Sequence, residues 1–148
     1  MKLTTEQAVA EIDRLLPCTI NNVDEILTVG FASWVRKQGL EFLEVEEGRV
    51  KARLSQDPEQ QMFTGAICGQ ATMSAIDTVM SLAMLTYGRK SKGTVNQNNQ
   101  FLRAAVGDDL IIEAIVLKMG RNTAYGETRI VFEGSGDLVV HSTSGYAF

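Results

Sequence analysis

The sequence predicts an α+β fold in which an antiparallel sheet wraps around one central helix, with additional helices at the N-terminus. Helical periodicity is confined to residues 1–39 and 60–88. Strand-like alternation begins at residue 40 and dominates after residue 93. Short Gly-containing turns separate the last four extended runs and leave no room for crossover helices, so these strands must pair antiparallel.

The 148 residues are enough for one domain with its own core. We expect a single domain over 1–148, with an N-terminal helical segment at 1–39 and the core at 40–148. The net charge of −4 and the lack of a basic block exclude a general nucleic-acid partner. The first residues lack the apolar stretch of a signal peptide, and the least charged run is rich in polar side chains. We therefore expect a cytoplasmic protein with no membrane partner.

The N-terminal segment predicts two helices. Thr4 or Thr5 caps the first, and Pro17 ends it. The second covers 22–39, with Gly39 as a plausible C-cap. Apolar side chains recur at helical spacing in both: Ala8, Val9, Ile12, Leu15 and Leu16 in the first, and Val23, Ile26, Leu27, Phe31 and Trp34 in the second.

Residues 40–55 alternate between apolar and charged side chains on either side of Glu46-Glu47-Gly48, which predicts a β-hairpin. A loop over 56–61 leads to the central helix. The remaining strands are expected at 94–104, 108–120, 123–134 and 137–148, in an antiparallel meander.

The central helical run, 60–88, contains one charged residue, Asp77. A surface helix carries charge along one side, so this helix is expected to be enclosed nearly all round. Its polar residues Gln70, Ser74, Asp77 and Ser81 are spaced four, three and four, which places them on one stripe. A polar stripe on an enclosed helix must face a wet cleft, a partner subunit or a substrate.

Two interpretations of Asp77 are open. In the structural one, Ser74, Ser81 or backbone amides satisfy a buried carboxylate. In the functional one, Asp77 lines a pocket and acts as base or nucleophile. Gly65 and Gly69, at the expected helix start, favour the functional interpretation, because free N–H groups and the helix dipole there form an oxyanion hole. The combination indicates an acyl-transfer site.

Other chemistries have little support. Cys18 and Cys68 are isolated thiols without a CxxC motif, and His141 is the one histidine. A zinc site, a Ser-His-Asp triad and a Cys-His pair are therefore not expected. His141 lies in a predicted strand, where a structural role is expected. We expect no metal and no other cofactor.

The segments "TGAICGQATMSAIDTVMSLA", "TVNQNNQFLRAAVGDDLIIEAIVLKMGRNTAYGE" and "LVVHSTSGYAF" together resemble the PaaI-like family of hotdog-fold acyl-CoA thioesterases. That family has a Gly-containing loop that opens the central helix, an Asp or Glu nine positions after the first loop residue, a Phe-Leu-Arg stretch and a Gly-Arg turn. Here the acidic residue nine positions after Cys68 is Asp77. The resemblance covers roughly residues 60–148.

The resemblance implies a hotdog-fold homodimer, possibly a dimer of dimers, that hydrolyses acyl-CoA to a free acid and CoA. It implies that Asp77 is the catalytic carboxylate and that the Gly69 N–H binds the thioester oxygen. Thr94 and Ser81 match hydroxyl positions that orient water in relatives. The sites are expected at the subunit seam, with Thr94 serving the Asp77 of the partner chain.

The substrate-binding candidates include departures from the family pattern. Cys68 stands where many members have His, and Gln70 replaces a second Gly or Pro. Met62 stands where some relatives have an Asn that orients the substrate. Gln60 or Gln61 is a candidate to substitute for that Asn. Arg103 and Arg121 are the first candidates for the CoA phosphates. A larger set comprises Arg89, Lys90, Lys92 and Lys118 as further cations, and Phe63, Met73, Met80 and Met84 as apolar pocket candidates.

The run "NQNNQ", Asn96 to Gln100, has polar side chains on both faces of a predicted strand. Alternation predicts that Thr94, Asn96, Asn98 and Gln100 share one face. Such a strand fits a subunit seam or an exposed position, and the sequence does not decide between them. Two other functions are weighed: a non-catalytic acyl-CoA-binding or regulatory hotdog protein, and a hotdog dehydratase, which ranks last because it would need a His–acid pair.

Overall fold

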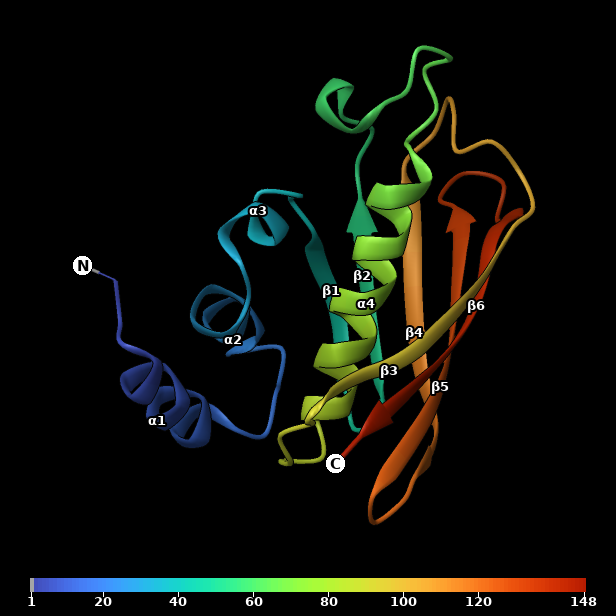
Figure 1. Cartoon of the computed structure of the whole chain (residues 1–148). Coiled ribbons are helices and arrows are strands. Elements are labelled where there is room, and N and C mark those ends of the chain that lie inside the picture. The colour runs from blue at the N-terminus through green and yellow to red at the C-terminus, as the bar shows by residue number, and fades with distance from the viewer. Residues whose placement is uncertain (1) are drawn as a thin grey trace.

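The computed structural model describes residues 2–148, which form one six-stranded antiparallel sheet along one long helix. In Figure 1 the long helix, α4, lies along one face of the sheet, as the sequence predicts. The bounds are α4 (Gly69–Leu85), β1 (Glu41–Glu46), β2 (Arg49–Leu54), β3 (Gly93–Phe101), β4 (Leu110–Met119), β5 (Thr123–Phe132) and β6 (Leu138–Ala147).

Three shorter helices precede the sheet and lie on the β1 side of α4 (Figure 1): α1 (Thr5–Leu15), α2 (Val23–Gly30) and α3 (Ser33–Arg36). A single-turn helix, η1 (Pro58–Gln60), follows β2. Thr4 caps α1 as predicted, in a capping box with Gln7. No helix within residues 2–148 is long and apolar enough to cross a membrane.

The expected single helix over 22–39 is wrong, because the chain is extended at Phe31 and Ala32. Gly30 ends α2 at a point where α1 approaches closely. A Cβ at Gly30 would lie 3.2 Å from Cδ1 of Ile12, so glycine suits this close packing while weakening the helix.

The predicted meander of the last four strands is also partly wrong. The sheet order is β1-β2-β4-β5-β6-β3, so β4, β5 and β6 form a meander while β3 lies beyond β6 at the sheet edge. Burial explains this order. Leu110, Ile112 and Ala114 of β4 are fully buried under α4, which suits a central strand. The amide-rich β3 is mostly exposed and suits an edge.

Helix α4 begins at Gly69, later than the run of low charge suggests. Residues 61–68 instead form a loop, with a bridge between Gln61 and Ile67. Gly65 therefore does not open the helix as expected. Its φ of +84° places it in the turn in which the Gly65 N–H donates to the Met62 carbonyl, and that conformation favours glycine.

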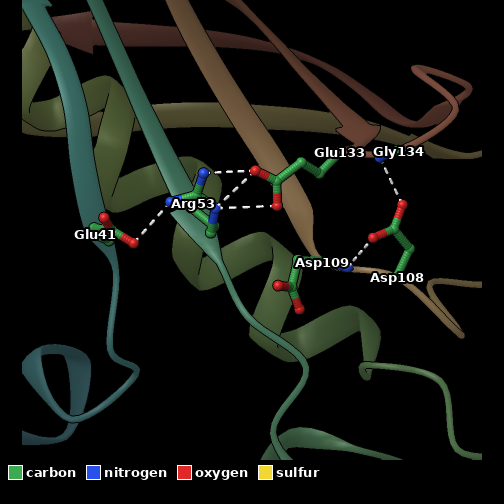
Figure 2. Close-up of polar contacts among 6 residues, drawn as sticks. All are labelled: Glu41, Arg53, Asp108, Asp109, Glu133 and Gly134. Carbon is green, nitrogen blue, oxygen red and sulfur yellow. Dashed lines mark hydrogen bonds and ion pairs between the residues drawn. The ribbon is translucent and has the colours of Figure 1, made fainter.

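A polar network fixes the loop between β3 and β4. Figure 2 shows Asp108 accepting hydrogen bonds from the N–H groups of Gly134 (2.7 Å) and Asp109 (2.8 Å). The Asp109 carboxylate accepts from the N–H of Gln56 at 2.8 Å. On the same end of the sheet, Arg53 of β2 bridges Glu41 of β1 and Glu133, which follows β5 (Figure 2). The loop that carries Arg103 is thereby tied to two neighbouring segments.

Thr86, just after α4, allows a test of the packing between α4 and the hairpin. Its buried hydroxyl accepts from the Gly48 N–H at 2.8 Å and donates to the Ala83 carbonyl at 2.6 Å. We expect Thr86→Val to lower the free energy of unfolding by about 1–3 kcal/mol, because the isosteric side chain leaves the Gly48 N–H unpaired. Urea unfolding measures the change. Thr143→Val, at an exposed position of β6, is the control, and equal stabilities of the two variants would contradict the assignment.

Candidate active site

Asp77 lies in the middle of α4 and is partly exposed. Its Oδ1 accepts two hydrogen bonds, from Thr94 Oγ1 at 2.7 Å and from the Tyr146 hydroxyl at 2.9 Å. Its Oδ2 accepts none from residues 2–148. One oxygen is therefore fixed by the protein, while the other is available to a water molecule or a substrate.

The structural interpretation assigned the bonding of Asp77 to Ser74, Ser81 or backbone amides, and that assignment is wrong. Ser81 contacts the Tyr146 hydroxyl at 3.4 Å and reaches Asp77 only through it. The stripe itself is found as predicted: Gln70 is exposed, and Ser74, Asp77 and Ser81 are partly exposed, while the sheet side of α4 is buried. The stripe is the open face of the helix.

Tyr146 of β6 is the residue that the sequence analysis missed. It is 1% exposed, and burial together with the nearby Asp77 charge raises the pKa of its phenol. The phenol consequently stays protonated at neutral pH and donates to the carboxylate. The signal was present in the alternation of Ser142, Ser144 and Tyr146 along the last strand, which places a tyrosine on the inner face.

Thr94 reaches the Asp77 of its own chain, which differs from the expectation that it serves the partner. The reason is a β-bulge between Thr94 and Asn96, where β3 gains an extra residue against β6. Thr94 is opposite Tyr146 and shares its inward face. Beyond the bulge, Gln97 and Asn99 face inward as well, so the predicted common face of Thr94, Asn96, Asn98 and Gln100 is wrong.

Gly69 is the first residue of α4, after Cys68 as N-cap. Within residues 2–148, the N–H groups of Gly69 and Gln70 donate to no protein acceptor, as is usual in the first turn of a helix. A pocket of about 390 Å³ adjoins this helix start, and its lining includes Gly69, Met62, Arg103, Phe101 and Val140. The helix dipole makes these free N–H groups suitable for an anionic oxygen.

Asp77 and Gly69 of one chain are too far apart to act on one carbonyl group. They are eight residues apart on α4, which corresponds to about 12 Å along the axis. Asp77 does not line the pocket beside Gly69. A nucleophile and an oxyanion donor must each lie about 3 Å from the reacting group. One chain therefore carries two halves of a site without joining them.

The substrate-binding candidates divide between the two ends of α4. Met62 and Arg103 line the pocket, and Cys68 and Gln70 flank Gly69 in the chain. The Arg103 guanidinium donates to the Leu138 carbonyl at 2.7 Å. Arg121 lies in the turn between β4 and β5, at the opposite end of α4 in Figure 1, so this chain does not bring it to the pocket.

Several further candidates are engaged elsewhere. Gln60 donates to the Gln38 carbonyl and to Asp57, Gln61 donates to Gln56, and neither lines the pocket beside Gly69. Arg89 donates to the carbonyls of Gly120 and Arg121 and stacks over Phe148, and Lys90 pairs with Asp13.

His141 lies 2.8 Å from Glu127, on the face of the sheet away from α4. A catalytic Cys68 would need a base, and this histidine does not supply one. Cys18 is buried beneath the N-terminal helices, where burial raises the pKa of its thiol to about 12. Cys18 therefore lacks the surroundings of an activated thiolate.

Sequence comparison finds similarity to known proteins. Residues 64–138 match the family model described as Thioesterase superfamily. Human acyl-coenzyme A thioesterase 13 is 27% identical over 94 residues, which cover 62% of this chain and 67% of the relative.

Solved structures share the fold. Zebra fish thioesterase superfamily member 2 has a TM-score of 0.79 at 23% identity, covering 87% of this chain and 97% of that one. The Escherichia coli PaaI protein has a TM-score of 0.75 at 16% sequence identity, and the match covers 97% of this chain and 100% of that one. A Streptococcus mutans protein bound to acetyl CoA has a TM-score of 0.70 at 17% sequence identity, and the match covers 74% of this chain and 87% of that one. The predicted PaaI-like hotdog fold and the predicted enzyme class, a thioester hydrolase, are confirmed.

Tyr146→Phe tests the protonated phenol. At neutral pH we expect the variant to lose about 1–3 kcal/mol of unfolding free energy, because Asp77 loses a donor. The folded chain binds the phenol proton more tightly than the unfolded chain, so this contribution is complete below the ordinary pKa of 10 and declines as pH rises above it. Urea unfolding at a series of pH values should show the stabilities of parent and variant converging above pH 10. A constant difference would contradict the raised pKa.

Cys68→Ser tests the N-cap of α4. Cys68 has extended cap geometry but makes no side-chain cap bond. Serine is among the preferred cap residues, so we expect the variant to gain about 0.5–1 kcal/mol of stability. Thermal unfolding measures this change. A variant no more stable than the parent would contradict this prediction for the cap.

Proposed function

The chain belongs to the Thioesterase superfamily, and we propose that it hydrolyses an acyl-CoA to a free acid and CoA. The name of the human relative and the acetyl CoA in the Streptococcus mutans structure support CoA thioesters as the substrate class. The observation that carries the proposal is the bonding of Asp77, whose Oδ1 accepts from Thr94 and Tyr146 while its Oδ2 accepts no hydrogen bond from residues 2–148.

In the proposed reaction, Asp77 Oδ2 takes a proton from a water molecule as the water oxygen attacks the thioester carbonyl carbon. The carbonyl oxygen becomes an oxyanion, which accepts a hydrogen bond from the Gly69 N–H at the positive end of α4. The tetrahedral intermediate then collapses, the C–S bond breaks, and the proton on Asp77 passes to the CoA sulfur. Thr94 and Tyr146 hold the carboxylate in place, and Ser81 orients the Tyr146 hydroxyl.

We propose that each complete site is formed by two chains, with Asp77 from one and Gly69 from the other. The separation of about 12 Å along α4 supports this arrangement. Apolar side chains beside the edge strand β3 support an interface there, since Val95 is 66% exposed, Phe101 is 53% exposed and Met73 is 37% exposed. A homodimer is the smallest assembly that fits, and light scattering distinguishes it from a dimer of dimers.

Arg103 is the proposed contact for the CoA phosphates, because it lines the pocket beside Gly69. Arg121 remains a candidate only if a second chain carries it to the pocket. Met62 and Gln70 would contact the substrate beside the thioester, and Cys68 would shape the loop that presents Gly69.

Asp77→Asn keeps the shape of the side chain and removes the base. We expect kcat to fall by at least ~10²-fold on any acyl-CoA that the parent hydrolyses, since general-base catalysis contributes that much. Release of the CoA thiol measures the rate. A variant as fast as the parent would exclude Asp77 as the base. If an acyl–Asp77 anhydride is trapped from the parent reaction, Asp77 itself, and not a water molecule, attacks the thioester.

Gly69→Pro removes the proposed oxyanion donor while keeping the helix. Gly69 is the first helical position, where proline is tolerated, and Cys68 already has the extended conformation that precedes proline. A Cβ at residue 69 would meet the Phe101 ring at 3.4 Å, an ordinary contact. We expect kcat to fall about 10²–10³-fold. Gly69→Ala, which keeps the N–H, is the matched control and should stay close to the parent.

Mixing the two inactive variants tests the shared site. In a heterodimer of Asp77→Asn and Gly69→Pro chains, one of the two sites would combine the intact Asp77 with the intact Gly69. After subunit exchange we expect recovery to about a quarter of the parent rate, because about half of the dimers are heterodimers with one intact site each. Subunit exchange without recovery would place both groups of a site on the same chain.

A further inference from the structure

Three buried hydroxyl groups on the inner face of the sheet have no hydrogen-bond partner among residues 2–148. They belong to Thr128, Ser142 and Ser144, whose exposed fractions are 1%, 0% and 3%. The buried Oδ1 of Asn99 also has none. Leaving a buried polar group unpaired costs about 1–3 kcal/mol, so several neighbouring ones indicate a polar occupant.

The strand register places these groups side by side. Asn99 of β3 is opposite Ser142 of β6, and Ser142 is opposite Thr128 of β5. Strands are about 4.8 Å apart, so the three residues form a row about 10 Å long across the sheet. Ser144 is two positions along β6 from Ser142 and is opposite Gln97. We call Asn99, Ser142, Thr128 and Ser144 the hydroxyl row.

Within one chain, the hydroxyl row lies between the Asp77 cluster and the pocket at Gly69, which belong to two different proposed sites. Along β6, it separates Val140, which lines the pocket at Gly69, from Tyr146, which contacts Asp77. Along β3, Asn99 separates Phe101 of the pocket from Thr94 of the Asp77 cluster. At a rise of about 3.3 Å per residue, Ser144 and Ser142 are about 7 and 13 Å along the strand from Tyr146. That is the distance range of an acyl chain of medium length.

Flexible groups cover the row. The Met80 side chain packs against Gly126, the neighbour of Ser144 across the strands, so closely that a Cβ at residue 126 would overlap its thioether. At the exposed edge, Gln97 donates to the Met73 carbonyl at 3.4 Å and accepts from Asn99 at 2.8 Å. Methionine side chains adopt many rotamers, so Met80 can yield to an entering chain.

We propose that the hydroxyl row binds a neutral hydroxyl or carbonyl oxygen carried by the acyl group of the substrate. This inference rests on the proposed acyl-CoA hydrolysis and names the acyl class. A hydroxyl group on the chain donates to Asn99 Oδ1 and accepts from Ser142 or Thr128. A carboxylate does not fit, because the row itself contains no cation, and the charged neighbours of Thr128 along β5, Glu127 and Arg129, alternate to the outer face of the sheet.

The test compares octanoyl-CoA and decanoyl-CoA with their counterparts hydroxylated near the carbonyl, mid-chain and at the terminal carbon. We expect kcat/KM to favour a mid-chain or terminal hydroxyl by at least about tenfold, because a site built to bond a hydroxyl discriminates against its absence. Ser142→Ala and Thr128→Val should each reduce that preference to near one. Thr143→Val, which faces outward beside Ser142, should leave the preference unchanged.

Stability provides a second measurement on the same variants. Removing the unpaired buried hydroxyl in Ser142→Ala, or replacing it by a methyl group in Thr128→Val, should leave Tm unchanged or raise it. A clear fall in Tm would assign the row to structural water and overturn the proposal. Hydrolysis of both substrate types without preference would overturn it while leaving the proposed function intact. No hydrolysis of any acyl-CoA would contradict the proposed function itself.

Discussion

The structure depends on covering α4, a helix too apolar to lie on a surface. The sheet covers most of the helix, and the residues buried by this packing are Thr72, Ala75, Ile76, Thr78, Val79, Met80, Leu82, Ala83 and Met84. A six-stranded sheet of one chain leaves one stripe open, and Asp77 lies on it. The carboxylate therefore avoids the cost of full burial while staying beside an apolar core. The same packing that stabilises the fold thus positions a carboxylate at a protected surface.

Two strands far apart in sequence complete the carboxylate site. The bulge in β3 turns Thr94 inward, and β6 brings the buried Tyr146 to the same carboxylate oxygen. Both strands pair with each other at the sheet edge, so their registers are mutually fixed. A shift of one residue in either would turn its hydroxyl to the outer face. The precision of the site therefore comes from strand pairing rather than from any local motif.

At the N-terminal end of α4, backbone groups rather than side chains provide the proposed hydrogen-bond donors. There the chain leaves free backbone N–H groups at Gly69 and surrounds them with loops held by Gln38, Gln56, Gln60 and Asp108. Backbone donors need no particular side chain, only a fixed helix start. The proposed oxyanion site therefore does not depend on the side chains of Cys68 and Gln70. It also leaves a gap between the two ends of the helix, which the hydroxyl row spans on the sheet side.

Local patterns in the sequence predicted most of the helices and strands and the position of Asp77 on a polar stripe, while the roles of the site residues stay predictions. Low charge identified α4, spacing placed Asp77 on a stripe, and alternation gave the hairpin and the strands, because these signals depend only on neighbours in the chain. Tertiary structure decided the place of β3 at the edge, the break after Gly30, the role of Tyr146 and the inward turn of Thr94. Each of these depends on which strand pairs with which and on where a bulge falls, and no local pattern of side chains specifies that. The contact between Tyr146 and Asp77 joins residues 69 positions apart, so only the folded chain brings them together.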